Sequence, residues 1–157
     1  MNSLPTRMVY AAAAISLAGA AIHVAAIVGG PSWYQFFGAP PRIVDSAHAG
    51  TWLAPVSAAA IAFLMGICAL YACSALGLVR RLPMLRLTLA GIAAICLLRG
   101  LVVLPLAFTH PALRTPFEVI AALVWATAGL GFVAGFFAAR PYSPSAHAGR
   151  GQARKSP

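Results

Sequence analysis

Residues 85–108 read LRLTLAGIAAICLLRGLVVLPLAF, an apolar stretch with Arg86 at its start and Arg99 deep inside it. A mostly apolar run of roughly 20 residues is enough to cross the hydrocarbon core of a membrane as a helix. The guanidinium of Arg99 cannot lose its proton and must find partners at that depth. The whole chain offers two acidic side chains, Asp45 and Glu118, that could neutralise it.

The composition of the chain is that of an integral membrane protein. Of its 157 residues, 61% are hydrophobic and 8% are charged, whereas soluble domains carry about 25% charged residues. The apolar runs are continuous and rich in Ala, Leu and Gly, which excludes the alternating strands of a membrane barrel. We therefore predict an all-α four-helix bundle, residues 1–140, and a disordered basic tail, residues 141–157. The predicted spans are Met8–Val28, Trp52–Val79, Met84–Ala107 and Phe117–Ala139.

Small residues recur at four-residue spacing in three of these spans. Such spacing favours close contact between membrane helices. The three sets are Ala12, Ser16 and Ala20, then Ala58, Ala62 and Gly66, then Thr127, Gly131 and Gly135.

The first span has a second interpretation, a cleaved signal peptide. Arg7 precedes the apolar run, and residues 17–20, LAGA, are small enough for a cleavage site. The run continues through Val28, beyond the core of about 7–15 residues that signal peptides have. Its length favours a helix that is retained.

The basic residues predict the orientation in the membrane. The N-terminus, the connection between the second and third spans and the tail hold most of them, whereas the other two connections hold Arg42 and Arg114. The positive-inside rule then places both termini in the cytoplasm. The net charge of +9 indicates attraction to anionic lipid headgroups on that side. No aromatic–basic pattern indicates binding to nucleic acid.

The first outer connection, residues 29–40, reads GGPSWYQFFGAP and predicts a short helix at the membrane interface. Ser32 and Gln35 have the spacing of a capping box, Gly38 is a suitable end, and Trp and Tyr rings favour the interface. Asp45 is expected to cap a lead-in to the second span. In its four spans and this turn-rich connection, the chain resembles the small bacterial membrane proteins called DoxX-like. The resemblance implies a four-helix fold in the bacterial inner membrane and assigns no site residues.

The ionisable residues predict a polar site toward the outer end of the bundle. Arg99 lies 13 residues beyond Arg86, about 20 Å along a helix, and His23 has a similar depth on the first span. A guanidinium offers planar, bidentate donors to a carboxylate or phosphate. We expect the site to bind an anionic amphiphile or lipid headgroup through residues of the spans and outer connections: Arg99, His23, Trp33, Tyr34, Asp45, His48 and Glu118.

These residues also have structural interpretations. Arg99 could extend to the outer interface, or pair with Asp45 or Glu118 as a structural lock. His23 could hydrogen-bond within the bundle, and both acids fit helix-capping positions. His48 and His110 stand in different connections without ligand spacing. We therefore expect no metal and no cofactor.

Three classes of function stay open at this point. A binding or accessory protein is favoured, because Arg99 and His23 beneath aromatic rings suit an anionic headgroup. A transporter or channel for an anion would require a homodimer, for which the small-residue sets provide contacts. A membrane enzyme acting on a lipid or quinone needs a proton donor and acceptor, and His23 with Glu118 is the pair that could serve. Enzymatic activity is not favoured.

Overall fold

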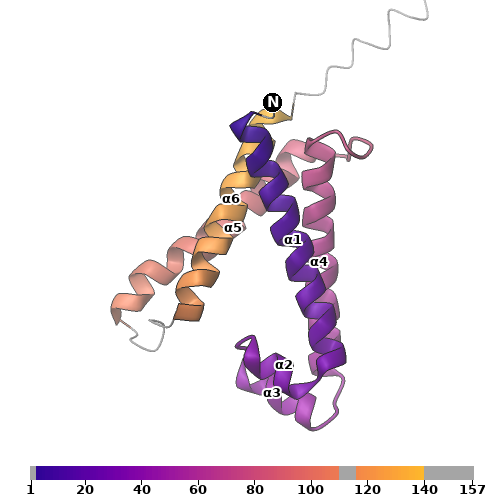
Figure 1. The fold of residues 1–157 in the computed structure, drawn as a ribbon, viewed down its shortest axis with the longest axis vertical. Coiled ribbons are helices and arrows are strands. Elements are labelled where there is room, and N and C mark those ends of the chain that lie inside the picture. Colours follow the sequence, from indigo (N-terminus) through magenta and orange to yellow (C-terminus); the bar gives the residue numbers. More distant parts are fainter. Residues whose placement is uncertain (1–2, 110–115, 140–157) are drawn as a thin grey trace, which may run out of the picture.

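The computed structural model describes residues 3–109 and 116–139, and this part of the chain is helical without strands (Figure 1). Four helices are long and apolar enough to cross a membrane, which confirms the predicted all-α class of four-helix membrane protein. Two short helices lie between the first two long ones. In chain order the helices are α1 Leu4–Gly29, α2 Pro31–Phe36, α3 Pro41–His48, α4 Leu53–Ala75, α5 Leu85–Thr109 and α6 Pro116–Ala138. The predicted tail lies outside the described residues.

Helix α4 ends four residues earlier than the predicted second span. The backbone N–H of Leu78 donates to the carbonyl of Cys73 at 3.0 Å, and the N–H of Gly77 donates to the carbonyl of Ser74 at 3.2 Å. This is the Schellman arrangement, which requires a residue with positive φ at the position of Gly77; its φ is 74°. The chain therefore turns at Gly77 even though the apolar run continues to Val79.

The first connection holds two helices where the sequence predicts one. The predicted short helix is α2, and α3 is a second helix that the sequence does not predict. The prediction that Asp45 caps a lead-in to the second span is wrong, because Asp45 lies inside α3. The start of α4 is capped by Ser46, whose hydroxyl oxygen accepts the backbone N–H of Ala54 at 3.0 Å. The same hydroxyl lies 2.6 Å from that of Thr51, so the end of α3 is tied to the start of α4.

The long helices pack as two pairs, α1 with α4 and α5 with α6, joined mainly through α1 and α6. In Figure 1 the pairs meet at the end where α1 begins and diverge toward the end that carries α2 and α3. The tight basic connection before α5 predicts that α4 and α5 are close neighbours. Instead, α4 and α5 contact each other little, and each packs mainly against another helix. We call the end where the pairs meet the basic end, after its arginines Arg7, Arg80, Arg81 and Arg86.

Most of the buried core lies where the two pairs meet. Phe132 of α6, Leu89 of α5 and Val9 of α1 are the largest fully buried side chains. Close contact between α1 and α6 depends on Gly131: a Cβ at this position would meet the backbone carbonyl of Met8 and lie 2.7 Å from the Cβ of Ala12. A second, smaller cluster at the other end packs Ala26, Tyr34, Ala54 and Ala58 together.

Candidate functional site

Arg99 lies on α5 where the helix pairs have begun to separate. The residues seven and fourteen positions before it are Ile92 and Leu85, which occupy nearly the same side of the helix. Leu85 is buried, Ile92 is half-buried and Arg99 is exposed. One face of α5 is thus covered near the basic end and uncovered further along, because α1 and α4 diverge from it. Arg99 therefore continues the row that begins at Leu85, whose side chain packs in the core where the pairs meet.

A similar row on α1 ends at His23. Val9 and Ser16, fourteen and seven residues before it, are 1% and 4% exposed, and His23 itself is half-buried. Its Nδ1 lies 2.8 Å from the carbonyl oxygen of Gly19. A carbonyl oxygen only accepts hydrogen bonds, so Nδ1 carries the proton and donates. The other ring nitrogen, Nε2, is then the one that can meet a further group.

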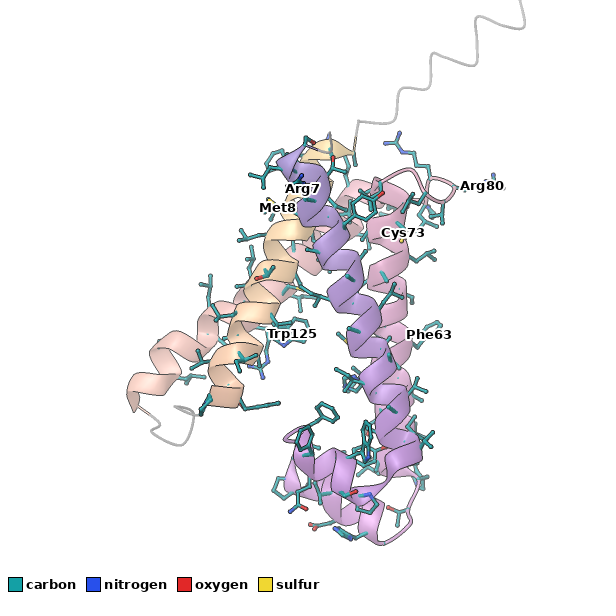
Figure 2. All side chains as sticks on the ribbon, in the orientation of Figure 1. Arg7, Met8, Phe63, Cys73, Arg80 and Trp125 are labelled. Atoms are coloured by element: carbon teal, nitrogen blue, oxygen red, sulfur yellow. The ribbon has the colours of Figure 1, made fainter. Side chains whose placement is uncertain are left out.

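Helix α6 supplies two more residues on the same pattern. Phe132 is 1% exposed, and the positions seven and fourteen before it are Trp125 and Glu118, both half-buried. Figure 2 shows the Trp125 side chain extending from α6 on the side of α1. Trp125 is not among the residues that the sequence predicts for the site. The seven-residue step from Phe132 is the signal that identifies it, once Phe132 is known to be buried.

The helix positions place Arg99 and Trp125 at one depth. A Cβ on Gly100 would lie 2.9 Å from the carbonyl oxygen of Ala122 and 2.9 Å from the backbone nitrogen of Ala126. Helices α5 and α6 are therefore in close contact at this height. Arg99 directly precedes Gly100 on α5, and Trp125 directly precedes Ala126 on α6. We call His23, Arg99, Glu118 and Trp125 the inter-pair set.

Arg99 forms no ion pair within residues 3–109 and 116–139. Both acidic side chains of the protein belong to the described residues, and among these residues no hydrogen bond or ion pair joins the Arg99 side chain to another group. Asp45 is exposed on α3, and Glu118 in the first turn of α6 makes interactions of its own. The structural lock between Arg99 and a carboxylate, one of the two interpretations of this arginine, is thus not the arrangement in the structure.

The predicted aromatic residues lie on α2 and differ in surroundings. Trp33 is 43% exposed, and its ring centroid is 5.9 Å from that of Phe37. Tyr34 is 6% exposed and packs in the smaller cluster, with a hydroxyl that is buried without a hydrogen-bond partner. This burial raises the pKa of the Tyr34 phenol. The structure therefore gives Tyr34 a packing position, whereas Trp33, with Ser32, Phe36 and Phe37, lines a surface pocket of about 360 Å³.

The loop after α2 reaches across to the other helix pair. A Cβ on Gly38 would lie 3.2 Å from the ring of Phe117, at the start of α6. The α2–α3 segment therefore extends from the α1–α4 pair to α6, on the side away from the basic end. Asp45 and His48 are exposed on α3. Within the described residues, no hydrogen bond or ion pair joins either of them to Arg99.

The described residues contain no group of side chains suited to hold a metal ion. Across residues 3–109 and 116–139, no three His, Cys, Asp or Glu side chains come together to form a metal site. Cys68, Cys73 and Cys96 are free thiols, and Cys96 is buried in the core. His110 lies outside the described residues.

Comparison of the chain with protein-family models, with curated proteins and with solved structures finds no match. The resemblance to DoxX-like proteins accordingly stays a prediction, and function must be argued from the site alone.

Proposed function

We propose that this protein is a membrane binding or accessory protein whose site, between the two helix pairs, takes the anionic head of an amphiphile. The observation that carries the proposal is Arg99, an exposed arginine on a membrane-length helix that has no carboxylate partner among the residues that the structure describes. A permanent positive charge within the hydrocarbon region is costly, so a bound anion that pairs with it stabilises the folded protein.

The neighbouring groups suit such a ligand. The Nε2 of His23 offers a second polar contact, and the indole of Trp125 offers an apolar face with an N–H donor. Arg99 itself provides the planar pair of donors that matches a carboxylate or phosphate. Exposed Leu98 and Leu123 flank this region on α5 and α6 and give the ligand's apolar chain a surface to lie on.

The orientation follows from the positive-inside rule. With the basic end in the cytoplasm, the inter-pair set lies toward the outer leaflet, and both termini are cytoplasmic. The resemblance to DoxX-like proteins supports the bacterial inner membrane as the compartment. An anionic amphiphile of the outer leaflet is the class of ligand that this arrangement favours.

The test is native mass spectrometry of the gently extracted protein, comparing wild type with Arg99→Met. We expect the wild type to retain an anionic molecule, and the variant to retain about tenfold less or lower still, as loss of a charge-assisted contact implies. Arg42→Met is the matched control, because Arg42 is an exposed arginine on α3. It should retain the ligand fully.

Three results would contradict the proposal. The first is a wild-type protein that carries no anionic molecule when it is extracted in mild detergent. The second is retention that is equal in wild type and in a folded Arg99→Met variant. A bound species that both arginine variants lose to the same extent would also count against it, because general charge attraction would explain the loss.

A further inference from the structure

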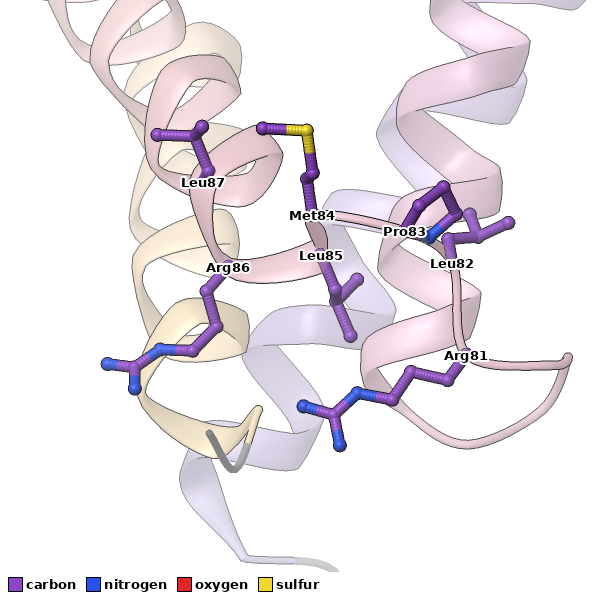
Figure 3. A pocket seen from close by; sticks show the side chains of 7 residues that line it. All are labelled: Arg81, Leu82, Pro83, Met84, Leu85, Arg86 and Leu87. Atoms are coloured by element: carbon purple, nitrogen blue, oxygen red, sulfur yellow. The ribbon is translucent and has the colours of Figure 1, made fainter. Parts of the chain in front are cut away.

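A pocket that includes two arginines lies at the basic end, away from the inter-pair set. It is lined by the consecutive residues 81–87, RLPMLRL, and has a volume of about 510 Å³ (Figure 3). The side chains of Arg81 and Arg86 point toward the end of the bundle, whereas those of Met84 and Leu87 point along the spanning helices. The pocket is therefore charged on one side and apolar on the other.

The loop that forms this pocket is fixed by two side chains of α4. The hydroxyl of Ser74 donates to the carbonyl of Arg80 at 3.2 Å and accepts the backbone N–H of Leu82 at 3.0 Å. The hydroxyl of Tyr71 donates to the carbonyl of Pro83 at 3.3 Å. These bonds hold the loop against α4, so the pocket is in place before any ligand arrives.

Arg86 is also held in place, with donor capacity left over. Its guanidinium carbon lies 4.4 Å from the ring centroid of Phe136, a cation–π contact that fixes the side chain against α6. Its Nε is buried and has no hydrogen-bond partner. A buried donor of this kind gains free energy when an acceptor reaches it.

We propose that this pocket binds the phosphate of one anionic phospholipid. Arg86 and Arg81 would face the phosphate, and the acyl chains would lie along Met84 and Leu87, which are 69% and 64% exposed. Two arginines on one side disfavour the cationic head of a zwitterionic lipid. The exposed apolar side chains, level with the start of a spanning helix, favour a lipid over free phosphate.

Native mass spectrometry with an equal mixture of phosphatidylglycerol and phosphatidylcholine of the same chain length tests the proposal. Wild type should retain one phosphatidylglycerol in preference, and Arg86→Gln should reduce this retention about tenfold. Arg80→Gln removes the same charge from an exposed residue of the same loop that does not line the pocket. It should retain the lipid as wild type does. Arg81→Gln, a second lining variant, serves if Arg86→Gln does not fold.

Three outcomes would overturn the proposal. Equal loss with Arg80→Gln and Arg86→Gln would show general attraction to a basic surface. No preference for phosphatidylglycerol in the wild type would show that the pocket does not select an anionic head. Displacement of the lipid by millimolar inorganic phosphate would assign the pocket to the free anion instead. The inter-pair set takes no part in this experiment, so its result is independent of the function proposed above.

Discussion

Replacing Gly131 by alanine should separate α1 from α6 and destabilise the protein. The new methyl would meet the backbone carbonyl of Met8 and lie 2.7 Å from the Cβ of Ala12. Carbon atoms prefer a separation of about 3.5–4.0 Å, so the helices must move apart by roughly 1 Å. Backbone cannot rotate away as a side chain can, and overpacking of this kind costs about 1–3 kcal/mol.

Gly135→Ala is the matched control, four residues further along the same helix. There the methyl would lie 3.6 Å from Ala75 and Val9 and 3.7 Å from Leu89, which is ordinary contact. Its stability should stay within about 0.5 kcal/mol of wild type or rise, because each new carbon contact adds about 0.1–0.2 kcal/mol. Both variants gain the same helix propensity, so the difference between them isolates the collision.

The assay is reversible unfolding in mixed micelles of dodecyl maltoside and SDS, followed by far-ultraviolet circular dichroism. We expect Gly131→Ala to unfold at lower SDS fraction than Gly135→Ala, with a difference of about 1–3 kcal/mol. Equal stability of the two variants would refute the close α1–α6 contact, and with it the reasoning that the two helix pairs join at this glycine.

Three further variants test the connections. Ser74→Ala leaves the N–H of Leu82 without its acceptor and should lower the free energy of unfolding by about 1–3 kcal/mol in the same assay. Ser57→Ala is the control and should cost less, because the Ser57 hydroxyl bonds only within its own helix. Tyr34→Phe deletes a buried hydroxyl without a partner and should leave stability unchanged or higher. Burial raises the pKa of Tyr34, so wild type should lose stability as pH rises above about 10, and Tyr34→Phe should lose less in an alkaline titration. Gly38→Ala forces alanine to a φ of 70° and should cost about 1–2 kcal/mol by thermal unfolding.

The sequence predicts the spanning helices well because their lengths follow from the thickness of a membrane. It fails at two boundaries. Gly77 ends α4 through the Schellman bonds, although the apolar run beyond it gives no sign of an end. The second is Pro41, which follows the predicted short helix and gives no sign of a new one, whereas the structure has it at the first position of α3, where proline is favoured.

The pairing of the helices was beyond the sequence. In a lipid-facing protein all sides of a helix are apolar, so hydrophobic periodicity does not identify the buried side. Small residues give partial guidance: Ala12, Ser16, Gly131 and Gly135 are buried as their spacing predicts, but Thr127 is exposed. For the same reason, the sequence predicts Arg99 and His23 as site residues from their depth in the membrane alone. It does not identify Trp125, because nothing in the sequence shows which side of α6 is buried.

The most direct test is the density beside Arg99 in a cryo-electron-microscopy reconstruction of the protein, bound to a rigid antibody fragment and extracted with its native lipids. We predict an elongated molecule between the two helix pairs, with its anionic head within about 3 Å of the guanidinium. An Arg99 guanidinium bound instead to the carboxylate of Glu118 or Asp45, with no molecule beside it, would contradict the proposed site.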